Sequence, residues 1–270
     1  MRKRLAAVIV AAALTAGCDT YHYLSGTIHE DVRRPIQAIK HYESFLARRP
    51  KDPRSCEVRL RAAELYRTFF LRCSDAQRHY EAAARDFPRM TACVDLAKAG
   101  LLKCPDYFPL DTGRTWVYVD SETKGKSMRL DWELRKSSGA AGGVITTALY
   151  AGNKRIREGR ESYFKENWAI WRTDGPQREP ILRYPYAEGQ TWKSLDGKGK
   201  EWTVVSTGTA VAVAAGFFAE CLKVKEHDLR YAGSWRYDYY CPGAGRVKTT
   251  VGGPGFENPN TELSRFSKAE

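Results

Sequence analysis

The sequence predicts an α+β protein in which a helical half precedes a sheet half. Apolar residues recur at helical spacing from residue 29 to residue 105, and they alternate with polar residues at strand spacing from residue 106 to residue 270. No helical segment of crossover length interrupts the second half, so its strands are expected to pair antiparallel. Because so long a sheet twists, we expect a strongly curved sheet or an open barrel.

The N-terminus carries the signals of a secreted protein. Residues 2–4 are all basic, and the apolar run over residues 5–13 is shorter than the roughly 20 residues that span a bilayer. Small residues then lead directly into Cys18. This arrangement resembles the lipobox of bacterial lipoproteins, although Leu14 lies one position earlier than is usual there. The resemblance implies a signal peptide over residues 1–17 and lipidation of Cys18, while an ordinary cleaved signal is the alternative.

The predicted anchor and the charge limit the partners. Removal of three basic residues with the signal lowers the formal charge from +12 to +9. This charge is compatible with a membrane surface, an anionic polymer or a lipid as ligand, and export argues against nucleic acid. The alternative, which we favour, is that the charge only reflects a generally arginine-rich composition. We expect the protein to face the periplasm, bound to the membrane through its lipid. In some bacteria an aspartate after the lipidated cysteine, here Asp19, retains a lipoprotein at the inner membrane. Because this rule varies, the choice between the inner and the outer membrane stays open.

An internal repeat organises residues 29–105, which follow a predicted polar tether over residues 18–28. The spacing Ala-x3-Tyr-x2-apolar-x4-Pro in residues 38–50 returns in residues 76–88, with a small residue at the apolar position. It resembles the second helix of tetratricopeptide repeats, and the segment resembles the repeats of BamD-like envelope lipoproteins. The resemblance implies tetratricopeptide-like hairpins and a groove for an envelope protein partner; a short helical spacer is the alternative. We predict helices over residues 33–48, 55–70, 75–87 and 91–102.

Four cysteines of the helical half are predicted to form two disulfides, which export permits. Cys56 and Cys73 bracket one helix and would lie about 25 Å apart at 1.5 Å per residue. Because neighbouring helices run antiparallel, Cys56 and Cys93 lie at one end of the stack, and Cys73 and Cys104 lie at the other. The predicted pairs are therefore Cys56–Cys93 and Cys73–Cys104.

Cys221 and Cys241 are not expected to bond to each other. A tight turn at His227-Asp228 would place Ser234 opposite Cys221. Cys241 would then lie about 23 Å farther along the strand at 3.3 Å per residue. A different turn would shift this register.

Alternation in the sheet half is clearest over residues 129–135 and 229–240. Weaker strand candidates are residues 115–120, 144–150, 162–171, 200–207, 209–214, 217–226 and 245–251. Residues 107–116, 215–224 and 240–248 resemble the recurring motifs of a TapB-like domain of unknown function in bacterial lipoproteins. This resemblance implies a β-rich periplasmic domain and supplies no catalytic residues.

A second repeat marks three tryptophans as candidate ligand-facing aromatics. The pattern Pro-x3-Gly-x-Thr-Trp ends at Trp116 and again at Trp192, 76 residues later. Each ring is expected to fill the core at a sheet corner, and stacking on a ligand is the alternative. Trp235 belongs to the aromatic run over residues 229–240, where alternation likewise favours a core position.

Motifs of catalysis are missing from the sequence. It has no Gly-x-Ser-x-Gly, phosphate-binding, His-Glu-x2-His or Cys-x2-Cys motif. His41 and His79 occupy equivalent repeat positions, and the charges over residues 155–166 indicate a solvated face. We therefore predict a non-enzymatic interaction scaffold without metal or cofactor. A carrier of lipid or another hydrophobic ligand in the concave sheet is the alternative, and an envelope hydrolase is the third hypothesis.

Overall fold

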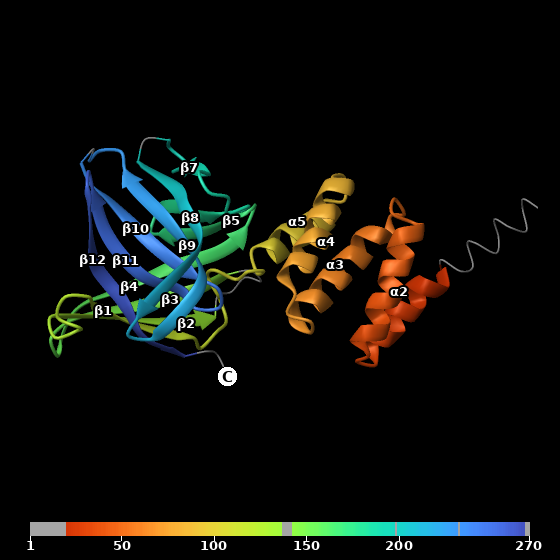
Figure 1. Cartoon of the computed structure of the whole chain (residues 1–270), viewed down its shortest axis with the longest axis horizontal. Helices are drawn as coiled ribbons and strands as arrows, with labels where there is room; N and C mark the ends of the chain where they lie inside the picture. Colours follow the sequence, from red (N-terminus) through yellow and green to blue (C-terminus); the bar gives the residue numbers. More distant parts are fainter. Residues whose placement is uncertain (1–19, 137–141, 198, 232, 268–270) are drawn as a thin grey trace, which may run out of the picture. The chain divides into compact units, whose positions relative to one another are not determined.

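The computed structural model divides the chain into two compact units, residues 1–104 and residues 105–270. The first is helical and the second is a β-sheet (Figure 1). The structure describes residues 20–136, 142–197, 199–231 and 233–267. The predicted signal peptide and Cys18 lie outside these residues.

Four helices of the helical unit begin and end within two residues of their predicted bounds. They are α2 (Pro35–Arg48), α3 (Arg54–Thr68), α4 (Cys73–Asp86) and α5 (Thr91–Leu101). Helices that are neighbours in sequence pack against each other, and α3 also packs against α5. The predicted tether is helical from residue 20, and this helix continues to residue 31. This helix buries only a narrow strip of side chains, in which Tyr23 packs on the α2–α3 core. Its sequence therefore lacks a clear helical pattern of apolar residues, and a polar tether was predicted instead of a helix.

The repeated positions of the sequence carry the core of the helical unit. Ala38, Tyr42 and Phe45 of α2 are buried, as are the equivalent Ala76, Tyr80 and Ala83 of α4. The Tyr42 hydroxyl donates a hydrogen bond to Glu30 (2.5 Å), and the Tyr80 hydroxyl donates one to Glu64 (3.1 Å). The 38-residue repeat therefore has a structural counterpart, while its tetratricopeptide character stays a prediction.

Two disulfides hold the helical unit together. One joins Cys56 near the start of α3 to Cys93 of α5, and the other joins Cys73 at the start of α4 to Cys104. These are the pairs that the antiparallel order of the helices favours.

The described part of the β unit forms one 12-stranded antiparallel sheet, which curves into a nearly closed barrel (Figure 1). Its strand order is β6-β5-β4-β3-β2-β1-β12-β11-β10-β9-β8-β7. The strands are β1 Thr115–Asp120, β2 Met128–Lys136, β3 Gly142–Ala151, β4 Lys154–Glu166, β5 Ala169–Asp174, β6 Gln177–Arg183, β7 Thr191–Lys193, β8 Lys200–Val213, β9 Gly216–Asp228, β10 Trp235–Cys241, β11 Gly245–Gly253 and β12 Phe256–Ser267. The two edge strands, β6 and β7, follow each other in sequence.

Several strand predictions were wrong. The predicted strand over residues 162–171 crosses the β4–β5 turn, where Asn167 and Trp168 have positive φ angles. Residues 200–207 and 209–214 form the single strand β8, whose pairing with β9 is broken by bulges. The strands β6 and β12 were missed because each contains a proline, which argues against a central strand. Pro180 and Pro259 are accommodated where the pairing register shifts.

The prediction of no bond between Cys221 and Cys241 was also wrong. The strand β9 runs on to Asp228, and β10 begins only at Trp235, so the turn lies later and is longer than expected. Leu222 consequently faces Tyr240. This shifted register brings the two cysteines together, and they form a disulfide.

The 76-residue repeat marks two equivalent positions in the sheet. Trp116 of β1 faces Trp132 of β2, and Trp192 of β7 faces Trp202 of β8. The indole of Trp116 donates a hydrogen bond to the Ala244 carbonyl, and the indole of Trp192 donates one to the Pro180 carbonyl. Trp116 is 2% exposed and Trp192 is 4% exposed. Both repeated tryptophans therefore belong to the core.

Candidate functional site

Side chains fill the inner face of the curved sheet. Large aromatic and aliphatic residues from both halves of the sheet are buried there, among them Trp132, Tyr163, Ile170, Leu182, Trp202, Leu222 and Tyr240. Phe108 stacks on Tyr163, with 4.7 Å between the ring centres. The inner face of the described sheet is thus packed with side chains.

A layer of ion pairs crosses this core and connects the two edges of the sheet. Its members are Arg172, Glu179, Lys200, Glu226, Arg236, Asp238 and Arg246, paired in that order. Lys200 of β8 lies 2.9 Å from Glu179 of the edge strand β6. Burial alone would raise the pKa of Asp238, but Arg236 and Arg246 outweigh it and lower that pKa. Each of these seven side chains therefore lies beside an opposite charge, with at most 3.8 Å between the paired atoms.

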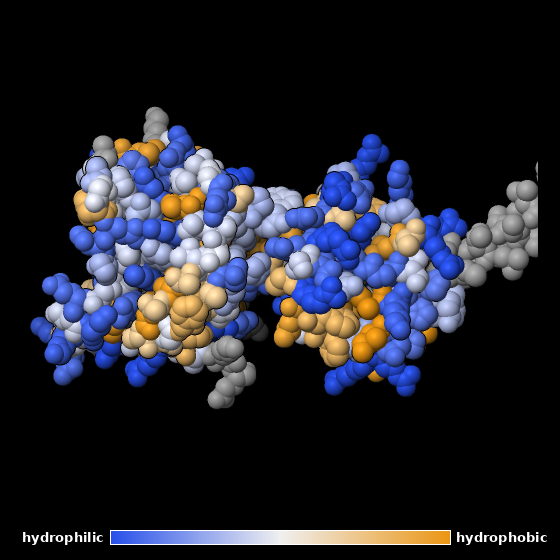
Figure 2. Space-filling model, in the orientation of Figure 1, coloured by the Kyte–Doolittle hydropathy of each residue, from blue (hydrophilic) through white to orange (hydrophobic). Residues whose placement is uncertain are grey.

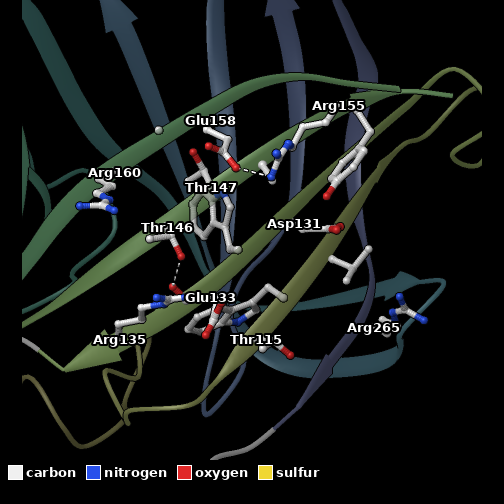
Figure 3. Close-up of a pocket in the computed structure, with 16 residues that line it drawn as sticks. Thr115, Asp131, Glu133, Arg135, Thr146, Thr147, Arg155, Glu158, Arg160 and Arg265 are labelled. Carbon is white, nitrogen blue, oxygen red and sulfur yellow. Dashed lines mark hydrogen bonds and ion pairs between the residues drawn. The ribbon is translucent and has the colours of Figure 1, made fainter. Parts of the chain in front are cut away.

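A groove lies on the other, solvent-facing side of the described sheet. A groove of about 850 Å³ runs over β1–β4 and the end of β12; we call it the β1–β4 groove (Figure 3). Its charged lining residues are Asp131, Glu133, Arg135, Arg155, Glu158, Arg160 and Arg265. Along β2, Glu133 of the groove alternates with Trp132 and Leu134 of the core. The strand periodicity of two therefore gives one face to the core and the other to the groove.

Positive charge is in excess in the β1–β4 groove, since four arginines face three carboxylates. Arg155 pairs with Glu158, and Arg135 pairs with Glu133 at 3.2 Å. Asp131 lies 3.1 Å from Arg129, which is outside the lining.

Two arginines of the groove are not part of these ion pairs. Arg160 and Arg265 are exposed, and neither side chain has an ion pair or hydrogen bond within the described residues. Figure 3 places them on different strands, β4 and β12. The groove can therefore hold an anion, and its carboxylates are engaged in ion pairs.

The sequence-predicted aromatics do not form one site. Trp116 contributes to the lining of the β1–β4 groove, but its ring is buried. Trp192 lies in the core beside Trp202. Trp235 is half-buried, and the Lys225 ammonium lies 3.8 Å from its ring centre. Sequence reasoning placed Arg155 and Arg160 on a solvated face and had no signal that Arg265 lies in the same groove.

The histidines of the helical unit make structural contacts. His79 Nε2 lies 3.0 Å from a carboxylate oxygen of Glu43, and its ring stacks on Tyr66. His41 Nδ1 lies 3.1 Å from His22 Nδ1. Burial, together with the nearby His22 and His29, lowers the pKa of His41.

The described residues offer neither a metal site nor a helix that could span a membrane. They contain no group of three or more His, Cys, Asp or Glu residues placed to hold a metal ion. None of their helices has the length and apolarity needed to cross a membrane.

Figure 2 shows apolar residues at the surface of the helical unit, interspersed with charged ones.

Comparison with known proteins gives weak likenesses only. No protein-family model matches the chain, and no curated protein matches it. One solved structure that resembles it is described as a "putative exported protein with YMCC-like fold" from Bacteroides fragilis, with 16% identity and a TM-score of 0.45 over 60% of this chain and 98% of that chain. Another is a "putative lipoprotein" from Parabacteroides distasonis, with 14% identity and a TM-score of 0.39 over the same shares. The resemblances to lipoproteins, tetratricopeptide repeats and a TapB-like domain stay predictions from the sequence.

Proposed function

We propose that this protein is a lipid-anchored scaffold of the bacterial cell envelope that acts by binding partners. The basic start, the short apolar run and the small residues before Cys18 support export and lipidation. Three disulfides fit an oxidising compartment. In this proposal the helical unit binds an envelope protein, and the β unit binds an anionic polymer in the β1–β4 groove.

The excess of arginine in the β1–β4 groove is the observation that carries the polymer site. Arg160 and Arg265 are exposed and have no carboxylate partner within the described chain. Arginine offers up to five donors in a fixed fork, which suits carboxylate and phosphate oxygens. A polymer of such groups would satisfy both side chains at once.

The carrier alternative has less support. A carrier needs an apolar concavity, whereas the described inner face is filled by aromatic residues and by the ion-pair layer. The hydrolase hypothesis needs a carboxylate free to act as acid or base. In the β1–β4 groove, Glu133, Glu158 and Asp131 each lie beside an arginine.

A charge-reversal experiment tests the polymer site. We expect the double variant Arg160→Glu, Arg265→Glu to bind fluorescent polyglutamate on the order of tenfold or more weakly, a change of about 1.4 kcal/mol or more. Binding is measured by anisotropy at physiological salt, where charges act over about 8 Å. The matched control is Arg157→Glu, an exposed arginine of the same strand β4 that does not line the groove.

Two results would count against the polymer site. Wild-type affinity in the double variant would show that the groove takes no part in binding. The control reverses one charge and the double variant reverses two. If Arg157→Glu loses half as much binding free energy as the double variant, only the overall positive charge attracts the polymer.

A further inference from the structure

The first helix of the helical unit presents an apolar stripe to solvent. Along helical residues 20–31 and the turn that follows, apolar side chains recur at spacings of three, four and four residues. Their exposed fractions are 59% for Tyr21, 51% for Leu24, 59% for Ile28 and 55% for Val32. Ile36, in the first turn of α2, adds a fifth apolar side chain that is 52% exposed. Spacings of three and four place Tyr21, Leu24, Ile28 and Val32 on one helix face. Ile36 lies beyond a break in the helix at Arg33, whose φ angle is positive.

The opposite face of this helix is fixed by packing. Tyr23 lies against Phe45, with 5.8 Å between the ring centres, and Glu30 accepts the hydrogen bond from Tyr42. Gly26 is buried so closely against Tyr42 that a Cβ atom there would lie 2.4 Å from the ring. At 3.6 residues per turn, positions 23, 26 and 30 lie opposite the stripe. The helix therefore cannot rotate its apolar stripe toward the core. An ordinary surface helix, in contrast, buries its apolar face and exposes its polar one.

The chain length before the helix indicates what covers the stripe. Residue 20 lies only two residues after Cys18, and two extended residues span at most about 7 Å. A lipidated Cys18 would therefore hold the start of the stripe at the level of the lipid headgroups. An amphipathic helix at a membrane surface buries its apolar face about 5–10 Å deep.

The charges beside the stripe fit the same surface. Arg33 and Arg34 follow the helix and are exposed, so they can reach anionic headgroups. His22 and His29 lie along one edge of the stripe, and Asp31 is the exposed acidic residue at the other edge. The two arginines outnumber this carboxylate, while His22 and His29 lie against His41 of α2.

We propose that residues 20–32 form a membrane-contact surface, in which Tyr21, Leu24, Ile28 and Val32 insert into the outer part of the lipid layer beside the anchor. This inference rests on the proposed lipidation of Cys18. Acyl anchors hold a protein more firmly when a second contact accompanies them. The stripe supplies that contact and holds the first helix along the membrane.

Photocrosslinking tests the proposal on the mature full-length protein. Variants carry p-benzoylphenylalanine in place of Leu24 or of Ile28, and each is purified from membranes and reconstituted in phosphatidylethanolamine and phosphatidylglycerol vesicles with a radiolabelled phospholipid. The matched control carries the same probe in place of Leu71, which is 79% exposed on the same unit. We expect several-fold more phospholipid crosslinking at positions 24 and 28 than at position 71.

The intact mass of each sample separates the two ways to fail. If Cys18 carries its acyl groups and positions 24 and 28 label no more lipid than position 71, the membrane-contact surface is refuted and the anchor stands. Crosslinks between two copies of the chain at positions 24 and 28 would also refute it, in favour of a dimer face. An unmodified Cys18 would refute the anchor, and the inference with it.

Discussion

At the scale of single residues, each repeated tyrosine of the helical unit packs closely against a glycine of a neighbouring helix. A Cβ atom at Gly26 would lie 2.4 Å from the ring of Tyr42, and one at Gly100 would lie 2.3 Å from the ring of Tyr80. The two tyrosines occupy the same position in the 38-residue repeat. The helix that approaches Tyr42 precedes α2, whereas the helix that approaches Tyr80 is α5, which follows α4. Both approaches leave no room for a side chain larger than that of glycine.

The substitution Gly26→Ala tests this close contact by the sign of its effect. In an open helix, this change stabilises by about 0.8–1.0 kcal/mol because alanine is the better helix former. Here the added methyl group meets the Tyr42 ring, and we expect a loss of about 1–3 kcal/mol, as in an overpacked core. The measurement is urea unfolding followed by helical circular dichroism.

The neighbouring change Ser25→Ala is the control, because Ser25 belongs to the same helix and is only half-buried. It is expected to change the stability by less than about 0.5 kcal/mol. An unfolding midpoint of Gly26→Ala above that of the unmodified protein would show that the contact is loose.

At the scale of elements, sequence patterns located the helices better than the strands. The boundaries of α2 to α5 follow from apolar spacing together with stops such as Pro50 and Pro88. The first five residues of β4, Lys154–Glu158, are charged except for the exposed Ile156, so apolar alternation does not reveal this part of the strand. Whether Cys221 and Cys241 can bond depends on the length of the turn between β9 and β10. The alternation of apolar and polar residues does not reveal that length, because local backbone geometry sets it.

Removal of the β9–β10 disulfide gives a test at this scale. We expect the double variant Cys221→Ser, Cys241→Ser to lose about 2–4 kcal/mol of stability, since the bond restricts the unfolded β unit. All seven tryptophans lie in residues 106–270, so tryptophan fluorescence during urea unfolding reports on the β unit alone.

The pair Cys56→Ser, Cys93→Ser is the matched control, because its disulfide lies in the helical unit. Its tryptophan transition is expected to stay at the position of the unmodified protein. If the Cys221→Ser, Cys241→Ser variant also unfolds there, the disulfide contributes nothing to the sheet.

At the scale of the whole molecule, the fold brings together what the sequence keeps apart. The β1–β4 groove combines Thr115 near the start of the β unit with Arg265 near its end, because β1 pairs with β12. The ion-pair layer likewise connects Glu179 of one sheet edge with Lys200 next to the other. The α+β class and the order of the two halves were predictable from periodicity. The groove was not, since no local pattern encodes a pairing between strands about 150 residues apart.

The mass of the mature protein tests the central claim, that a lipid anchor holds a binding protein at the envelope, most directly. The chain is expressed in full, extracted from bacterial membranes with detergent and measured intact without reduction. The account predicts a protein that begins at Cys18, carries a diacylglyceryl group there and lacks the six hydrogens of three disulfides. A soluble protein that retains residues 1–17 and a free thiol at Cys18 would contradict it.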